Sequence, residues 1–565
     1  MLRNRLPDET ATYPDATRGV NLRKSLEDLE PGEAELMQNC YWDSDIRKRF
    51  GAARWTTVSL GMTNALGGHK GYFGDGTGIR VVAFDTNLVQ VSDTGLLTTL
   101  TTTLTTGNNT YFVDWAITDR TYITNGYDPM RFLESTGTLS TITGTNMPSS
   151  PTMVVPYLDR LFALQGNVVV TSDPRSDSVW ATTGSAWAAF RAIGGSGNPT
   201  AIALHSSTGT PGDPQAQLLI FQRNSVTALI GTNFGAPITS GSPPTDWDAQ
   251  MILLDPRTGT SSPYSVCNVP GVGTFWFTSE RNIAWLPIGS SVPRLIGMSL
   301  YSYRAGIQGV NDVTQASQLA QVLMIYHDLK LKLYLPVDGQ AYSSLQYWLD
   351  LRPLMENLAS VLVQPSENFP ANWSGPHIGQ SIRRVWIENQ SNDQERLMGV
   401  EGNPNNGLMV YELNPLGYYK DDSGISTSSD IAMEYASFFH PFGAPGYQKN
   451  LYDLMIDSNG YINFATVTVS DLHATLTSGY DIRQLNGSVF TNITYSTPTG
   501  YRYGNGTRYG QASANNLGHV NFTARSDVMA AGDALQVQVQ HAMGNGYNIN
   551  SIRAQVKIDK IQPYT

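Results

Sequence analysis

The strongest constraint on the fold is a degenerate repeat between about residues 58 and 400, in which pairs of apolar strands return roughly every 40 to 60 residues. In most copies an apolar strand leads into a short polar turn and then into a second apolar strand. The tip of a hairpin needs polar residues that can bend the chain. These turns carry the pairs Asp119-Arg120, Asp159-Arg160, Arg223-Asn224, Glu280-Arg281 and His327-Asp328. Four strands per unit at this period are typical of a β-propeller. We therefore expect a propeller over residues 58–440, with insertions at about 205–260 and 400–440.

The pattern changes beyond residue 440, where two segments alternate strictly between apolar and polar residues. These segments are 449–470 and 519–561, and within the second Leu535, Val537 and Val539 alternate with glutamines. Such alternation is typical of a half-buried antiparallel sheet, and it predicts a sandwich-like domain over residues 441–565. Between the two segments, residues 495–511 are rich in Gly and Tyr and have no periodicity, which predicts a long projecting loop.

Few segments have a helical pattern, so the predicted class is mainly β with few short helices. One helix is expected to begin at Pro31-Gly32-Glu33 within an N-terminal arm over residues 1–57. A second is expected from about Asp312 to Leu323, and a third after Asp350. The threonine-rich run 98–112 is expected to be an exposed strand that ends near Gly107, because Thr is β-branched.

Composition narrows the class of protein. The chain has 565 residues, too many for one ordinary core, and only 15% of them are charged, against about 25% in average domains. The net charge of −11 does not suggest the basic patch of a sequence-specific DNA-binding protein. Two cysteines, Cys40 and Cys267, make no disulfide framework, which indicates synthesis in a reducing cytoplasm. The N-terminus lacks the apolar region of a signal peptide, and no window is apolar enough for a membrane helix.

The sequence lacks the short motifs that mark common catalytic, phosphate-binding and metal-binding sites. There is no Gly-rich phosphate loop, no His-Glu-x-x-His and no cysteine pair with metal-ligand spacing, so we expect no enzyme, no cofactor and no metal. Isolated histidines such as His327 and His377 are expected to be structural. A propeller glycosidase remains an alternative, because a carboxylate pair cannot be recognised in sequence. The sialidase-type turn is approached once, at Val91-Ser92-Asp93-Thr94-Gly95.

A series of short motifs occurs in a fixed order between about residues 20 and 565. The motifs are Pro31-Gly32-Glu33-Ala34, Gln38-Asn39, Arg47-Lys48-Arg49 with Gly51, Ile123-Thr124-Asn125-Gly126 with Asp128-Pro129, Leu158-Asp159-Arg160-Leu161-Phe162, Ser172-Asp173-Pro174 with Trp180, Ser261-Ser262-Pro263-Tyr264-Ser265-Val266, Phe277-Thr278-Ser279 and the last two strands. Taken together, they resemble the tail tubular protein B, or tail nozzle, family of short-tailed bacteriophages, which is similar to phage head-completion proteins called DNA-stabilisation proteins.

The resemblance implies a structural virion protein of the phage tail. Six copies would form a ring around a channel that carries and gates genome DNA during ejection, in contact with tail adaptor or portal-proximal ring proteins and with tail fibres. The DNA would pass without sequence-specific binding. Two alternatives stay open: a head-completion or stopper protein at the portal, and a receptor-binding or carbohydrate-binding tail propeller.

Two sets of residues are candidate functional sites. The cluster Arg47-Lys48-Arg49 is expected at an open edge, or against acids of a neighbouring subunit or adaptor, because unpaired buried charge is costly; a merely solvated turn is the alternative. The loop 495–511, with Tyr501, Tyr503 and Tyr509, is a candidate gate at the tip.

Overall fold

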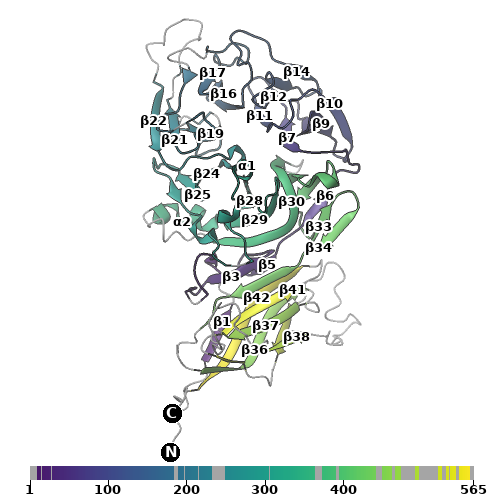
Figure 1. Ribbon diagram of the computed structural model, residues 1–565, viewed down its shortest axis with the longest axis vertical. Coiled ribbons are helices and arrows are strands. Elements are labelled where there is room, and N and C mark those ends of the chain that lie inside the picture. The colour runs from purple at the N-terminus through teal and green to yellow at the C-terminus, as the bar shows by residue number, and fades with distance from the viewer. Residues whose placement is uncertain are drawn as a thin grey trace, which may run out of the picture.

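The computed structural model describes residues 9–559 except 14–15, 27, 183–188, 196, 211, 214, 232–233, 235–247, 305, 363–371, 390–393, 441–447, 461–464, 472–489, 495–518, 525–529, 533–534 and 542–545. Figure 1 shows a ring of small sheets above a second group of longer strands, with β3 (Glu33–Gln38) and β5 (Ile46–Lys48) between them. The chain is therefore a mainly β protein that combines a β-propeller with a C-terminal antiparallel β-sandwich-like domain, as the sequence predicted.

Five blades of the propeller are separate four-stranded antiparallel sheets. The first contains β7 (Ala65–Tyr72), β8 (Gly78–Phe84), β9 (Asn87–Val91) and β10 (Leu97–Thr101). The second contains β11 (Tyr111–Trp115), β12 (Arg120–Thr124), β13 (Arg131–Leu133) and β14 (Leu139–Thr141). The third contains β15 (Met153–Tyr157), β16 (Arg160–Gln165), β17 (Val168–Thr171) and β18 (Ala189–Phe190). The fourth contains β19 (Ala201–His205), β20 (Gln217–Phe221), β21 (Val226–Ile230) and β22 (Gln250–Asp255). The fifth contains β23 (Cys267–Val269), β24 (Gly273–Phe277), β25 (Ile283–Pro287) and β26 (Arg294–Leu295).

Two further blades share one long bent strand, β30 (Trp373–Asn389). Its first half pairs with β29 (Ser343–Asp350) and completes a sixth blade with β27 (Leu323–His327) and β28 (Lys330–Leu335). Its second half pairs with β31 (Glu395–Glu401), followed by β32 (Val410–Leu413) and β6 (Ala52–Arg54). The innermost strands contact one another in the order β7, β11, β15, β19, β23, β27, β30 and back to β7, so the described residues form a closed ring of seven blades.

The N-terminal segment closes the ring and joins it to the C-terminal domain. β6 comes before the first blade in sequence but is the fourth strand of the seventh, so this blade contains chain from both ends of the propeller. Beyond β6 the sheet continues as a hairpin of β33 (Lys420–Ser423) and β34 (Thr427–Asp430). β2 (Gly19–Val20) pairs with both β30 and β3.

The C-terminal domain consists of two sets of strands. One follows the order β39 (His519–Ala524), β36 (Gln448–Gly460), β42 (Tyr547–Asp559), β5 and β4 (Cys40–Trp42), with β1 (Glu9–Tyr13) on β42 and β40 (Ala530–Gly532) on β36. The other follows the order β3, β35 (Met433–Ser437), β41 (Leu535–His541), β37 (Ala465–Asp471) and β38 (Phe490–Thr494). Strands from the first 50 residues are thus built into both sets.

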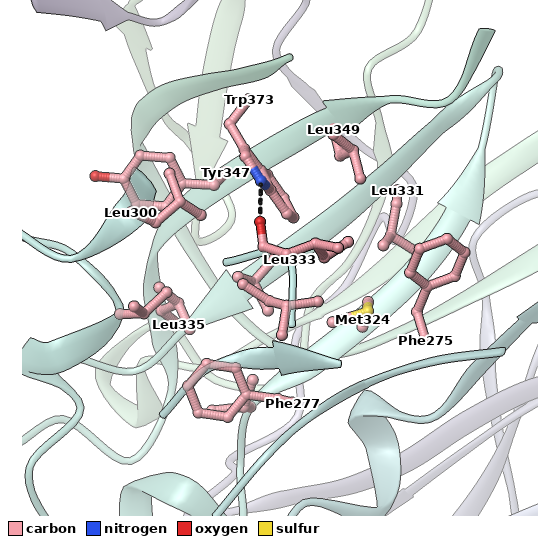
Figure 2. Close-up of a cluster of buried hydrophobic side chains, with 14 of the residues drawn as sticks. Phe275, Phe277, Leu300, Met324, Leu331, Leu333, Leu335, Tyr347, Leu349 and Trp373 are labelled. Atoms are coloured by element: carbon pink, nitrogen blue, oxygen red, sulfur yellow. Dashed lines mark hydrogen bonds between the residues drawn. The ribbon is translucent and has the colours of Figure 1, made fainter. Parts of the chain in front are cut away.

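The core lies between neighbouring blades, because each blade is covered on both faces. β24 and β25 are buried at every position, which explains why they are almost continuously apolar. Figure 2 shows the largest cluster, where Phe275 and Phe277 of the fifth blade meet Leu331 and Leu333 of the sixth. Trp373 closes this cluster and donates its indole N–H to the carbonyl of Ile296 at 3.3 Å.

Several local predictions need correction. The helix expected from Pro31 is wrong: residues 33–38 form β3, because pairing with β35 and β2 buries the apolar side chains that suggested a helical face. The second helix is reduced to α1 (Ala316–Leu319), since β27 begins at Leu323. The third is confirmed as α2 (Arg352–Leu362).

The structure also corrects the predicted boundaries of the loop and of the two insertions. The threonine-rich run is a strand only to Thr101, and β11 begins at Tyr111. Residues 205–260 are not an insertion, since they include β20 to β22 of the fourth blade. Residues 400–440 contain β32 of the seventh blade and the added β33–β34 hairpin. Among the described residues no helix is long and apolar enough to cross a membrane.

Candidate functional site at the junction and centre of the propeller

Arg49 lies at the centre of a buried polar network that fixes the N-terminal segment to the seventh blade. Its Nη1 and Nη2 atoms lie 3.0 and 2.5 Å from the two carboxylate oxygens of Asp421. Its Nε donates to Asn39 Oδ1 at 2.9 Å, and Gln380 donates to Asp421 Oδ1 at 2.9 Å. The side chains of Arg49 and Asp421 are 1% and 4% exposed, so this bidentate pair is shielded from water.

Two glycines allow the backbones to approach at this junction. A Cβ atom on Gly51 would lie 1.7 Å from the carbonyl oxygen of Lys420, so a side chain there would separate the N-terminal segment from β33. Gly379 has φ of +108°, and its Cβ would lie 2.6 Å from Asp421 Oδ2. Both positions require glycine, because the backbone of Lys420 fills the space beside Gly51 and the Arg49–Asp421 pair fills the space beside Gly379.

The other two cations of the cluster differ from each other. Lys48 is buried, its Nζ lies 3.2 Å from His541 Nδ1 of β41, and burial lowers the pKa of Lys48 to about 8. Arg47 is partly exposed and pairs with Asp43 at 2.7 Å and Asp45 at 2.5 Å. The expectation of an open edge is therefore wrong for Lys48 and Arg49, which hold the chain's own N-terminal segment in place. Arg47 alone remains near the surface, and its acidic partners belong to the same chain.

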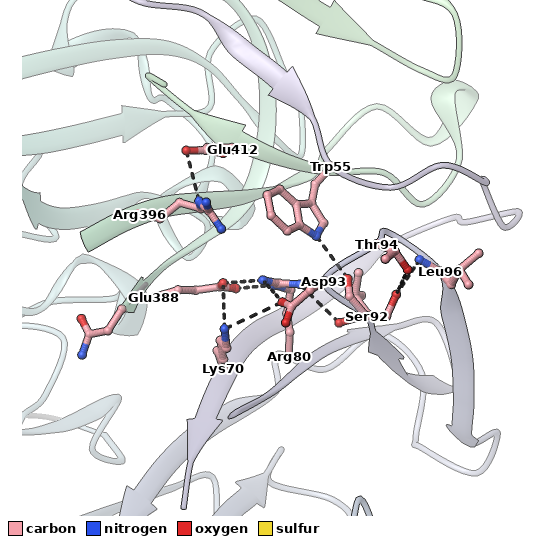
Figure 3. A network of polar contacts seen from close by, with 12 residues as sticks. Trp55, Lys70, Arg80, Ser92, Asp93, Thr94, Leu96, Glu388, Arg396 and Glu412 are labelled. Carbon is pink, nitrogen blue, oxygen red and sulfur yellow. Dashed lines mark hydrogen bonds and ion pairs between the residues drawn. The ribbon is translucent and has the colours of Figure 1, made fainter. Parts of the chain in front are cut away.

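A second polar network joins the first and seventh blades (Figure 3). Arg80 of β8 and Glu388 of β30 are both 1% exposed and pair through two contacts, with Nε–Oε1 at 2.5 Å and Nη2–Oε2 at 2.6 Å. The ring of Trp55 lies near two guanidinium groups, 4.8 Å from that of Arg80 and 4.5 Å from that of Arg396. The residue that follows β6 thus helps to stabilise the closure of the ring.

Tyr264 lies in the turn before the fifth blade, and its side chain extends across the centre of the propeller to the blades on the opposite side. Its hydroxyl donates to the carbonyls of Leu66 in the first blade and Thr110 at the start of the second. The ring of Tyr111 stacks on it at 4.8 Å, and the guanidinium of Arg384 lies 4.3 Å from its ring. We call Tyr264, Tyr111 and Arg384 the central cluster; it joins opposite blades across the axis.

The histidines have structural surroundings. His377 is buried with its ring centre 4.2 Å from that of Trp348, and burial holds its pKa well below the usual value. His69 of β7 lies 3.0 Å from Asp114 of β11, which links two inner strands. Among the described residues no group of three or more His, Cys, Asp or Glu side chains could hold a metal ion.

Charge is distributed unevenly between the interior and the surface of the described residues. The buried cations are as numerous as the exposed ones, eight in each case. The buried ones are Lys48, Arg49, Arg80, Arg160, Lys330, Lys332, Arg383 and Arg384. The exposed ones are Arg18, Arg23, Arg175, Arg191, Arg223, Arg257, Lys420 and Arg553. Exposed acids are twelve: Asp28, Glu30, Asp75, Asp93, Asp119, Asp248, Glu280, Asp328, Asp338, Glu356, Glu395 and Asp430. The described surface is therefore net acidic.

Two strand edges on opposite sides of the propeller in Figure 1 are candidate assembly surfaces. β22 is the outer strand of the fourth blade, and its Ile252 and Leu253 are 41% and 36% exposed. β34 ends the extension of the seventh blade, and all four of its residues are exposed. Unpaired strand edges can pair with another chain.

Sequence reasoning missed the role of the central cluster. Its signals were Tyr264, which lies in one of the motifs of the resemblance, and the pair Arg383-Arg384, which comes directly before Val385-Trp386-Ile387. Tyr501, Tyr503 and Tyr509, the candidate gate residues, lie outside the described residues.

No protein-family model and no curated protein matches the chain. Among solved structures, a streptogramin B lyase is 8% identical with a TM-score of 0.37, over 65% of this chain and 98% of that one. Virginiamycin B lyase from Staphylococcus aureus is 7% identical with a TM-score of 0.38, over 64% and 98%. BBS1N in complex with ARL6DN is 9% identical with a TM-score of 0.37, over 68% and 99%.

Proposed function

We propose that the chain is a structural subunit of the tail of a short-tailed bacteriophage, of the tail nozzle (tail tubular protein B) kind, and that copies of it surround a channel for genome DNA. The observation that carries this proposal is the placement of cations. Eight lysines and arginines are buried, and exposed acids outnumber exposed cations among the described residues. A DNA channel must not hold its cargo, and each cation on a phosphate adds affinity through counterion release.

The proposed channel lies between copies of the chain. Tyr264 contacts the first and second blades across the propeller axis, so the centre of one propeller is occupied by side chains. A duplex therefore requires a lumen that several subunits enclose. The low charged fraction of 15% suits subunits that pack side by side, because little charge has to be desolvated.

The two candidate assembly surfaces support a head-to-tail ring. Such a ring needs two different surfaces on each subunit, and β22 and β34 are different in character. β22 offers apolar side chains, whereas β34 has the sequence Thr-Ser-Ser-Asp. A hexamer docked on a tail adaptor or portal-proximal ring, with tail fibres as further partners, would place the protein in the virion tail. Arg47 remains a candidate contact for the adaptor, and loop 495–511 remains a candidate gate.

Electron microscopy of virions that carry a gold-binding tag on this chain tests the proposal. Label in a ring at the distal tip of the tail is expected. Label at the portal would favour the head-completion alternative, and label on peripheral fibres would favour the receptor-binding alternative; either result would overturn the nozzle assignment.

A gel-shift assay with random-sequence duplex DNA at low salt tests the charge argument separately. No retention is expected for the wild type. Strong binding that weakens steeply with salt would show a cationic surface and contradict a channel lined by acidic and uncharged groups.

A further inference from the structure

Arg383 occupies an unusual position on the inner strand of the seventh blade. The register of β30 against β31 shifts between Ile382 and Arg384, so Arg383 is the extra residue of a β-bulge. This is where β30 stops pairing with β29 and enters the centre of the ring. Bulges often redirect a side chain next to a functional site.

Arg384, its neighbour, is bound only by neutral acceptors. Nε donates to the carbonyl of Leu66 at 3.0 Å, Nη1 to the carbonyl of Arg383 at 2.6 Å, and Nη2 to the side chain of Asn109. Its guanidinium also lies over the ring of Tyr264. These contacts fix the side chain in position but leave its positive charge without a carboxylate partner among the described residues.

Arg383 has even fewer contacts. It is 7% exposed, and its Nε is buried without a hydrogen-bond acceptor among the described residues. Burial and the neighbouring Arg384 lower the pKa of Arg383 to about 9, while Tyr264 acts in the opposite direction. Two consecutive arginines of the seventh blade's inner strand are therefore buried, and neither has a carboxylate partner within the part of the chain that the structure describes.

The same chain pairs other buried arginines with acids. Arg49 has Asp421, and Arg80 has Glu388. An uncompensated buried charge is costly, and two side by side cost more. The arrangement is stabilised if an anion from solution supplies the missing negative charge.

We propose that Arg383 and Arg384 form a binding site for a small oxyanion, phosphate or carboxylate, at the centre of the propeller. Guanidinium groups present planar pairs of N–H donors that match the oxygens of both anions. The free Nε of Arg383 supplies a donor that is already desolvated. The site does not depend on the proposed role in the phage tail.

Calorimetric titration of the full-length chain with inorganic phosphate, at constant ionic strength, tests this proposal. Saturable binding of one phosphate per chain is expected. Arg383→Gln should weaken it about tenfold or more, because charge-assisted donors are lost. Arg223→Gln is the matched control: this arginine is exposed at a hairpin turn of the fourth blade, and its loss should leave binding unchanged. Absence of saturable binding, or equal binding by Arg383→Gln and the wild type, would overturn the site.

Repeating the titration with acetate distinguishes the two oxyanions: acetate that binds more tightly than phosphate identifies the site as a carboxylate receptor.

A second measurement covers the possibility that Arg383→Gln folds poorly. Thermal unfolding in phosphate-free buffer should give a Tm for Arg383→Gln at or above that of the wild type, because the variant loses an uncompensated charge. Phosphate should raise Tm in the wild type only. If the variant does not fold, bromide-soaked crystals of the wild type should give an anomalous peak beside Arg383, and a featureless map there would contradict the proposal.

Discussion

Arg49 and Asp421 are 372 residues apart in sequence, yet they form a bidentate ion pair that is almost completely buried. The pair joins the segment between β5 and β6 to the hairpin that extends the seventh blade. Since β5 belongs to the C-terminal domain and β6 to the propeller, Arg49 lies where the chain passes between them. The cluster that looked like a surface contact therefore holds the two parts of this chain together.

Asp421→Asn should destabilise the protein strongly. The substitution leaves Arg49 buried without a counter-charge, and breaking such a pair costs about 3 to 5 kcal/mol. Urea unfolding measures this as a fall in the midpoint. Asp430→Asn is the control on the same hairpin, since Asp430 pairs with Lys420 at 3.6 Å and is 41% exposed. An exposed pair contributes about 0 to 1 kcal/mol. Equal losses for the two variants would show that the burial of Arg49 is unimportant.

Glu388→Gln should weaken the closure of the ring. Glu388 accepts from Arg80 and from the indole of Trp386 at 2.8 Å, and Lys70 lies 3.9 Å away. Removing its charge leaves the buried Arg80 with only Asp93 as an acidic partner, at 3.3 Å and 80% exposed, so the cost should approach the roughly 3 to 5 kcal/mol of a broken buried pair. Hydrogen exchange should show faster opening of β6 and β8 than of β24. Glu412→Gln, which affects the partly exposed contact of Arg396 at 3.1 Å, should have a smaller effect. Uniform protection across the blades of Glu388→Gln would contradict a local role.

Lys332 should make stability depend on pH in the neutral to alkaline range. Its Nζ is buried 3.3 Å from His327 Nδ1 and 4.7 Å from the ring of Trp348. Burial is the main cause that lowers the pKa of Lys332 to about 7. The charge of Lys330 lowers this pKa as well, and the charge of Asp328 acts in the opposite direction. The unfolded chain therefore binds more protons than the folded one between about pH 7 and pH 10, and stability rises with pH across this window.

The measurement compares the wild type with Lys332→Met. The difference in unfolding free energy should shift in favour of the wild type by about 2 kcal/mol from pH 7 to pH 9. Lys420→Met removes an exposed lysine, and no such shift is expected for it. A difference between the wild type and Lys332→Met that stays constant with pH would show that Lys332 is ordinarily protonated in the folded state.

The fold was largely predictable from sequence, because the packing of the blades requires buried apolar strands separated by polar turns, and this local pattern is visible in the sequence. β24 and β25 are buried throughout and almost continuously apolar, and Asp119 at a hairpin tip adopts the left-handed φ of 55° that such a turn needs. The helix predicted at Pro31 failed because its partners, β2 and β35, are not visible from the sequence of residues 31–37.

The site was much less predictable, because its residues are joined only by the tertiary structure. Nothing near Arg49 in sequence indicates that Asp421 will neutralise it, so the sequence alone favours a surface position for the cluster. Tyr264 lies in one of the motifs of the resemblance, but its contacts with Leu66 and Thr110 depend on the closure of the whole ring. Local pattern predicts which residues are buried; it does not predict which polar partner each one meets.

The edge of β22 supplies the final prediction. Ile252 is 41% exposed on the outer strand of the fourth blade, and a lysine in its place should block pairing with another chain, because charged side chains protect strand edges. Ile252→Lys should fold with a stability within about 0.5 kcal/mol of the wild type, since the site is on the surface. The proposed assembly into a ring on a tail adaptor should be lost, and electron microscopy and sedimentation measure this loss. Thr99→Lys makes the same change on the outer strand of the first blade, where the exposed residue is already polar, and rings should form normally. If Ile252→Lys assembles as well as Thr99→Lys, the β22 edge is not the contact between copies, and the apolar residues there need another partner.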